Sequence, residues 1–218
     1  YINVQSKTAW HALGTQIANV APVLLHPLSR GAVMLNSADS GVHPKVVFNF
    51  LSHELDLQRM CMAFARGADV ANALVQQTDL GEPFPVPFGN LIRKLNVLNR
   101  GNAIKASLTA TAFDLIPALA DPVLIQLAGG GVTVTDLMSN EKRLQAHVLE
   151  NVAGLFHPAG TCCMGAANDA MAVTDPQGRV YGVDGLSVAD ASIMPELPSG
   201  NTNIPTLMIA EKIAASLS

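Results

Sequence analysis

His157 lies in a segment that could carry acid–base chemistry. The segment reads FHPAGTCCMG over residues 156–165, and its glycines and proline allow tight turns and a close approach of backbone to a ligand. An imidazole titrates near neutral pH, so it can take the hydroxyl proton when a hydride leaves an alcohol carbon. A lone histidine in an apolar run is also commonly a satisfied core residue. His157 is therefore a candidate general base, with a structural core histidine as the alternative.

Asn203 is a second candidate, at the start of a predicted final helix over residues 204–217. Pro205 suits the first turn of that helix, where the missing N–H has no intrahelical acceptor. The free N–H groups and the positive end of the helix dipole can face an anionic group. The Asn203 side chain could cap the helix or bind a substrate oxygen, and the sequence supports both roles.

Asp190, Ala191 and Ser192 form another motif, between these two in the chain. Aspartate and serine side chains often accept or donate hydrogen bonds to nearby backbone, so this motif predicts a turn. The turn could be purely structural, or its backbone could approach a bound cofactor.

Together these motifs resemble the glucose–methanol–choline (GMC) family of flavin-dependent oxidoreductases. Its members carry a His-Pro-x-Gly-Thr-Cys-x-Met-Gly stretch, then an Asp-Ala-Ser turn, then Gly-Asn-x-Asn-x-Pro-Thr opening the last helix. All three occur here in that order between residues 157 and 206. A weaker match over residues 25–51 resembles the start of the family's substrate domain. The resemblance covers most of residues 22–82 and 132–218.

The resemblance implies roles for individual residues. It implies that His157 is the catalytic base and that Asn203 binds the substrate oxygen. It also implies that the cofactor is FAD and that the substrate is a small primary alcohol, with the aryl-alcohol, hydroxymethylfurfural and choline branch favoured. The residues implied to contact FAD are Asp190, Ala191, Ile204 and Thr206.

The sequence lacks the dinucleotide-binding fingerprint that the complete family pattern includes. Gly129-Gly130-Gly131 is an uninterrupted run, whereas the dinucleotide fingerprint needs spaced glycines between a strand and a helix. We therefore expect a flexible joint at residues 129–131, and we expect that the N-terminal dinucleotide-binding domain is absent from this sequence. Cys163 stands where family members often have Arg.

Three functions are compatible with this pattern. The first is the C-terminal part of an FAD-dependent alcohol oxidoreductase. The second is a catalytically incomplete remnant or interaction module that cannot hold FAD alone. In either case the chain could self-associate or pair with a missing flavin-binding half. The third is a cyanohydrin lyase on the same fold. A yellow chromophore on the purified chain would argue against the second, and acid–base activity without redox activity would favour the third.

Composition excludes several other classes. The 218 residues are 49% hydrophobic and 14% charged, which predicts a folded domain. The net charge of -4 and the lack of Lys or Arg runs argue against nucleic-acid or membrane-surface binding. Three cysteines, two of them adjacent, suit neither a disulfide framework nor a metal site, so we expect no metal and a reducing, cytoplasmic location.

The expected fold class is α+β. We expect a mainly antiparallel sheet with flanking helices over residues 1–150, forming the substrate-binding region, and C-terminal pieces of an FAD-binding domain over residues 151–218. The predicted elements are a strand pair or bent strand over 23–35, a turn over 36–44, a helix over 53–76, a loop over 80–101, helices over 103–128 broken at Pro117 and Pro122, and a helix over 139–150 capped by Ser139.

Overall fold

The computed structural model describes residues 18–78, 80–85, 94 and 97–217. The chain divides into two compact units. We call Tyr1–Val23 with Leu57–Val152 the helical unit, and Leu24–Asp56 with Ala153–Ser218 the motif unit. The described residues contain helices and a small antiparallel sheet, so the predicted α+β class is confirmed.

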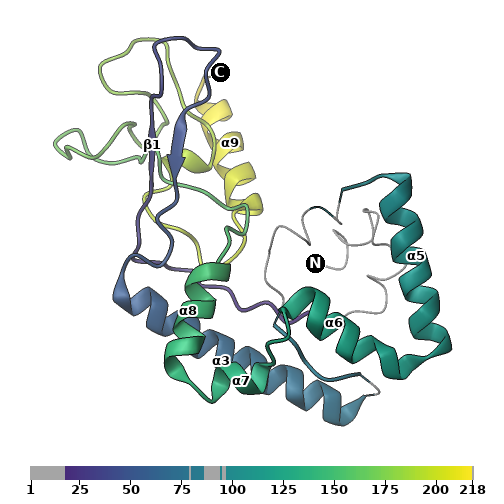
Figure 1. Cartoon of the computed structure of the whole chain (residues 1–218). Coiled ribbons are helices and arrows are strands. Elements are labelled where there is room, and N and C mark those ends of the chain that lie inside the picture. The colour runs from purple at the N-terminus through teal and green to yellow at the C-terminus, as the bar shows by residue number, and fades with distance from the viewer. Residues whose placement is uncertain (1–17, 79, 86–93, 95–96, 218) are drawn as a thin grey trace. The chain divides into compact units, whose positions relative to one another are not determined.

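Helices build the helical unit (Figure 1). They are α3 (Glu54–Gln77, which begins in the motif unit), α5 (Arg100–Leu115), the 3-10 turn η1 (Pro117–Leu119), α6 (Ala120–Gly129), α7 (Val134–Met138) and α8 (Glu141–Asn151). The prediction of a helix over 53–76 is confirmed by α3, whose first turn carries Glu54 and Asp56, the charge that a helix N-terminus favours.

The core of the helical unit follows helical spacing. Ala106, Ala110 and Phe113 are buried on one face of α5, and Leu144 and Val148 are buried one turn apart on α8. The predicted apolar face of the helix near residues 144–148 is therefore confirmed.

Prolines and caps account for two wrong predictions. The break at Pro117 is confirmed, because α5 ends at Leu115, but Pro122 lies inside the first turn of α6, where its missing N–H has no intrahelical acceptor. The cap of α8 is Asn140, whose side chain accepts a hydrogen bond from the Arg143 N–H at 3.1 Å. Ser139 instead ends α7, and its hydroxyl donates to the Asp136 carbonyl oxygen at 2.8 Å.

The glycine run over residues 129–131 ends a helix, and the predicted loop over 80–101 is described by the structure only in part. Gly130 has a positive φ of 61° and caps the C-terminus of α6, so the glycine run forms a helix-ending turn. The predicted loop over 80–101 falls partly on 86–93 and 95–96, which lie outside the described residues; residues 80–85 have no helix or strand, and α5 begins within the predicted loop at Arg100.

The motif unit contains a short sheet and the last helix. Strand β1 (Ala32–Met34) pairs antiparallel with β2 (Lys45–Val47), with Val33 opposite Val46. The predicted turn over 36–44 joins the two strands. The strand pair or bent strand predicted over 23–35 is wrong in extent, since only residues 32–34 of this range form a strand, and the N–H groups of Leu28 and Ser29 donate to Asp56 instead of to a ladder. Helix α9 (Asn203–Leu217) confirms the predicted final helix, and it contacts the 3-10 turn η2 (Ala191–Ile193). The core residues of this unit include Leu51, Ile193, Met194 and Ile213.

Asp56 fixes the loop that leads into β1. Its carboxylate is fully buried and accepts hydrogen bonds from the Leu28 N–H at 2.8 and 3.0 Å. It also accepts from the Ser29 N–H and the Ser29 hydroxyl, each at 2.6 Å. A buried carboxylate with several donors is stabilised in its charged form, so Asp56 ties this loop to the start of α3.

Residues Leu24–Asp56 therefore belong to the same unit as the three C-terminal motifs. The functional division into a substrate region over 1–150 and a flavin-site segment over 151–218 stays a prediction. Among the described residues, the structure contains no helix with the length and apolar character needed to cross a membrane.

Candidate functional site

The first two motifs lie side by side in the motif unit. The backbone N–H groups of Gly160, Cys162 and Met164 donate to the carbonyl oxygens of Ala191, Ser192 and Ile193, at 3.2, 2.8 and 2.8 Å. Alternate residues of the His157 segment thus pair with successive residues of η2. These bonds are made by backbone, so they fix the path of the segment whichever side chains it carries.

Gly160 occupies a position that favours glycine. Its φ is 83°, and a Cβ atom there would lie 3.2 Å from the Met194 carbonyl oxygen. The Cys163 thiol donates to the Gly160 carbonyl oxygen at 2.8 Å, which adds a hydrogen bond across the turn. The tight turn predicted from the glycines is therefore present.

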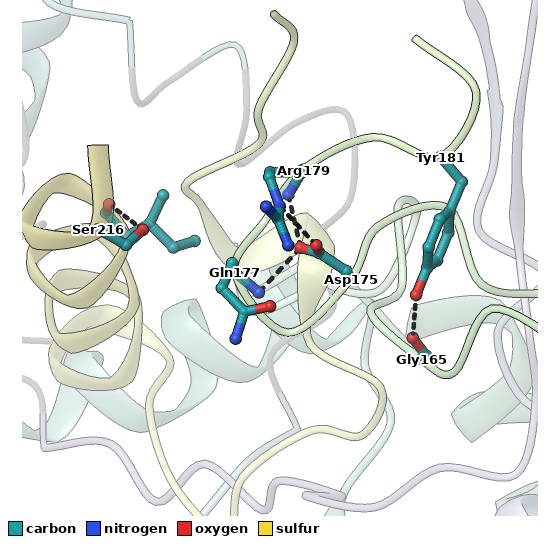
Figure 2. A network of polar contacts seen from close by, with 7 residues as sticks. Gly165, Asp175, Gln177, Arg179, Tyr181 and Ser216 are labelled. Carbon is teal, nitrogen blue, oxygen red and sulfur yellow. Dashed lines mark hydrogen bonds and ion pairs between the residues drawn. The ribbon is translucent and has the colours of Figure 1, made fainter. Parts of the chain in front are cut away.

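A polar network supports the far end of the same segment (Figure 2). The Tyr181 hydroxyl donates to the Gly165 carbonyl oxygen at 2.9 Å, and the Gly165 N–H donates to the Thr174 carbonyl oxygen at 3.0 Å. Next to Thr174, the Asp175 carboxylate binds the Arg179 guanidinium at 2.7 Å and accepts from the Arg179 N–H at 2.9 Å. This network holds the end of the segment against the following turn.

The third motif meets the first through a side-chain hydrogen bond. The His157 Nδ1 atom lies 2.9 Å from the Thr202 Oγ1 atom, although 45 residues separate the two in sequence. Thr202 is only 6% exposed, and His157 is half-buried. The bond engages one ring nitrogen and leaves Nε2 as the nitrogen for chemistry on a ligand.

Thr202, and not Asn203, caps α9. The Thr202 carbonyl oxygen accepts from the Thr206 N–H at 2.9 Å, which is the first bond of the helix. Asn203 is the first helical residue and its side chain is exposed. The capping alternative for Asn203 is therefore wrong, because the chain enters the helix one residue earlier.

Phe156 adds strain beside His157. Its φ is 62°, in the left-handed region that bulky residues rarely adopt, and its side chain is 90% exposed. Strained backbone of this kind costs about 1–3 kcal/mol and clusters at functional sites.

A pocket of about 490 Å³ opens next to these motifs, within the motif unit. Two of its walls come from β1 and β2 and from the His157 segment. Its lining residues are Val33, Val46, Phe48, Pro158, Ala159, Thr161, Asp190, Ala191, Ser192 and Thr206. Most of these side chains are apolar and a few polar groups stand among them, which is the usual character of a small-molecule site.

Asp190 keeps a negative charge at the edge of this pocket. Its carboxylate accepts hydrogen bonds from the Ser192 hydroxyl at 2.5 Å and from the Ser192 N–H at 2.8 Å. The hydroxyl bond first, and then the backbone bond, lower the pKa of Asp190 below its ordinary value. The predicted Asp-Ala-Ser turn is therefore present.

The pocket suits a flat ring system with polar edges. Its apolar walls can cover the faces of such a ring, and the pocket volume lies in the range of about 300–1,000 Å³ typical of cofactor sites. The residues present therefore fit a cofactor with apolar ring faces and polar edges, such as a flavin.

The structure places three of the six predicted site residues on the pocket lining, and neither His157 nor Asn203 is among the lining residues. Asp190, Ala191 and Thr206 line the pocket, and His157 directly precedes Pro158 in its wall. The Ile204 side chain is outside the lining and 71% exposed.

Sequence reasoning did not identify Thr202, the strand residues Val33 and Val46, or Phe48 directly after β2. Thr202 could have been found as a cap-type residue directly before the helix. The strand residues give no signal of their own, because only the fold brings them to the motifs.

Other reactive groups do not form a second centre in the part of the chain that the structure describes. No group of three or more His, Cys, Asp or Glu side chains could hold a metal ion there. Cys61, Cys162 and Cys163 are free thiols.

Comparisons with known proteins identify a family. A family model described as "GMC oxidoreductase" matches residues 27–210. The chain is 53% identical over 88 residues to the 5-(hydroxymethyl)furfural oxidase of Methylovorus sp. (strain MP688), covering 40% of this chain and 17% of that protein. It is 30% identical over 213 residues to the oxygen-dependent choline dehydrogenase 1 of Chromohalobacter salexigens, covering 98% of this chain and 29% of that protein. The chain thus spans less than a third of the length of these relatives.

Solved structures resemble the fold. A variant of the Aspergillus oryzae RIB40 formate oxidase matches 88% of this chain and 25% of its own chain, with a TM-score of 0.54 and 21% identity. An FAD-dependent oxidoreductase from Chaetomium thermophilum matches with a TM-score of 0.52 and 19% identity, over 88% of this chain and 25% of its own.

Proposed function

The chain belongs to the GMC oxidoreductase family, a family of FAD-dependent enzymes that act on CH–OH groups, and we propose that it is the C-terminal catalytic part of an alcohol oxidoreductase. One observation carries the proposal: the three sequence motifs converge on one pocket in the motif unit, with the Nδ1 atom of His157 bound to Thr202.

His157 acts as the general base. Its Nε2 atom takes the proton of the substrate hydroxyl, so that the oxygen can form a carbonyl as the hydride leaves the carbon. The Thr202 bond supports this role, because a ring held at Nδ1 presents Nε2 in one direction. A positioned base of this kind contributes about 10²–10⁴-fold to the rate.

Asn203 binds the substrate oxygen. Its side chain is exposed on the first turn of α9, directly after the threonine that holds His157. An amide N–H that donates to this oxygen stabilises the negative charge that the oxygen gains as the proton leaves.

The pocket holds the flavin. Asp190, Ala191 and Thr206 lie on its lining, together with the turn that follows His157. Bound FAD would supply the hydride acceptor, at N5 of its isoalloxazine ring. The chain's own residues orient the substrate and remove its hydroxyl proton.

A small primary alcohol is the proposed substrate class. The relatives with the matches above are named for 5-(hydroxymethyl)furfural and for choline, and both compounds carry a primary hydroxyl group. We also propose a reducing, cytoplasmic location, in keeping with three free thiols.

Anaerobic mixing of the flavin-loaded full-length protein, which contains this chain together with its flavin-binding half, with 5-(hydroxymethyl)furfural and, separately, with choline tests this function. We expect loss of the oxidised-flavin absorbance with at least one of them, and formation of the aldehyde. An oxidised flavin that persists with both alcohols, together with release of cyanide from a cyanohydrin such as mandelonitrile, would replace the oxidoreductase with a lyase.

A further inference from the structure

We infer that Thr202 is the positioning residue of His157, and that its hydroxyl oxygen accepts the Nδ1–H of the ring and so selects the tautomer with an unprotonated Nε2. The inference rests on the proposed function, since it concerns how the base is kept ready. Thr202 does not need to touch the substrate for this role.

The geometry allows two arrangements of the proton. At 2.9 Å, either Nδ1–H donates to Oγ1 or the Thr202 hydroxyl donates to Nδ1, because a hydroxyl group can do both. Only the first arrangement leaves Nε2 free to accept a proton. It is also the only arrangement that persists after Nε2 has taken the substrate proton, since both nitrogens of the protonated ring then carry hydrogen and neither can accept from the Thr202 hydroxyl.

The persistence of the hydrogen bond after proton transfer decides between the two arrangements. If Oγ1 already accepts from Nδ1–H, the hydrogen bond stays in place while Nε2 takes the substrate proton and it becomes charge-assisted. A hydroxyl that donates to Nδ1 would instead have to turn during the reaction. Groups that need no reorientation stabilise a transition state best.

Thr202 is held rigidly enough to impose this geometry. Its carbonyl oxygen accepts from both the N–H and the hydroxyl of Thr206, at 2.9 and 2.7 Å, so its backbone is fixed by the first turn of α9. The side chain is 6% exposed and branched at Cβ, which restricts its rotamers. Helix α9 therefore sets the direction of the His157 ring.

Three variants isolate the hydroxyl. Thr202→Val keeps the shape of the side chain and the carbonyl bonds to Thr206 but removes Oγ1. Thr202→Ser keeps the hydroxyl. Thr174→Val is the matched control, because Thr174 is fully buried in the same unit and its hydroxyl has no hydrogen-bond partner among the described residues.

Nitrogen-15 NMR of histidine-labelled protein reads the proton position without any turnover. With the ring neutral, we expect the wild-type, Thr202→Ser and Thr174→Val proteins to carry the His157 proton on Nδ1, and Thr202→Val to shift toward the Nε2–H form. The His157 signals are assigned by their loss in His157→Gln. A proton on Nε2 in the wild type, or the same tautomer in Thr202→Val, overturns the inference.

Flavin reduction gives the second readout, measured with whichever of the two alcohols reduces the wild-type protein. Thr202→Val should lower the limiting rate constant by roughly 10–100-fold, the usual effect of removing an orienting partner, with little change in alcohol affinity. Thr202→Ser should recover most of the rate, and Thr174→Val should match the wild type. If His157→Gln is slow but Thr202→Val is as fast as wild type, the positioning role is wrong and the base remains. If His157→Gln is also fast, the proposed function itself is wrong.

Discussion

The backbone N–H of Cys162 donates to the carbonyl oxygen of Ser192 at 2.8 Å, and this bond joins the segment of the proposed base to the turn at the proposed flavin pocket. It is one of a set of backbone bonds between the two segments. The position of His157 relative to the pocket therefore depends on backbone conformation, and substitutions that alter that conformation should matter more than changes of neighbouring side chains.

Gly160→Ala tests this dependence. A Cβ atom at a φ of 83° is strained, and it would also press within 3.2 Å of the Met194 carbonyl oxygen. Gly182→Ala is the control, since Gly182 has a φ of 77° but open space around it. Both variants bear backbone strain, and we expect Gly160→Ala to lose about 1–3 kcal/mol more unfolding free energy from crowding. Denaturant titration measures both, and equal losses would argue against the close contact.

Asp56→Ala should destabilise the motif unit strongly. It leaves the part-buried N–H groups of Leu28 and Ser29 without their fully buried acceptor, so we expect a loss of about 3 kcal/mol of unfolding free energy. Asp39→Ala removes a similar carboxylate that accepts from the Gly41 N–H on an exposed turn, and should cost less than about 1 kcal/mol. Thermal or chemical unfolding of both variants compares them, and a similar small effect at each position would show that Asp56 does not anchor its loop.

Local signals predicted the helices well. Helix α3 begins and ends within one residue of the predicted bounds, because capping residues and apolar periodicity act over short distances. The errors at Pro122 and at the cap of α8 have the same origin. A proline can break a helix or begin one, and Ser139 and Asn140 are both competent caps, so the sequence alone does not decide between the neighbouring choices.

The residues of the site likewise fall into those that local motifs identified and those that only the packed fold brings together. The motifs identified His157 and the Asp190 turn, and linked them by resemblance alone. The bond between His157 and Thr202 spans 45 residues, and Val33 and Phe48 reach the pocket from more than 100 positions away in the chain. No periodicity or spacing encodes such contacts, because they arise only when the segments pack.

His147 should make the stability of the helical unit depend on pH. Its ring packs edge-on against Phe64 with a centroid distance of 6.0 Å, and burial lowers its pKa below 6.5 despite the opposing charge of Glu150. The folded state thus resists protonation more than the unfolded state. The stabilisation is complete above about pH 6.5 and is lost as the pH falls from there toward the folded-state pKa.

The comparison with His147→Gln isolates this effect. We expect the unfolding free energy of the wild-type protein to fall more steeply between about pH 7 and pH 5 than that of the variant. Denaturant titrations across this range measure both curves. Parallel curves would mean that His147 takes up its proton equally in the folded and unfolded states.

Asn203 variants test the second proposed contact with the substrate. Asn203→Ala should slow flavin reduction by the alcohol, but less than loss of His157 does, because it removes one hydrogen bond of about 1–3 kcal/mol. Asn203→His should retain part of the activity, since an imidazole N–H can donate to the same oxygen. Stopped-flow reduction at saturating alcohol compares them, and a wild-type rate in Asn203→Ala would remove this residue from the site.

His157 carries the central claim, and the rate of flavin reduction in His157→Ala tests it most directly. The variant is made in the full-length protein and loaded with FAD to the same content as the wild type. It is then mixed anaerobically with the reducing alcohol and followed by flavin absorbance, with His157→Gln as a variant of closer shape. The account predicts a reduction rate roughly 10²–10⁴-fold below the wild type, the usual worth of a general base. Reduction of both variants at the wild-type rate would contradict it.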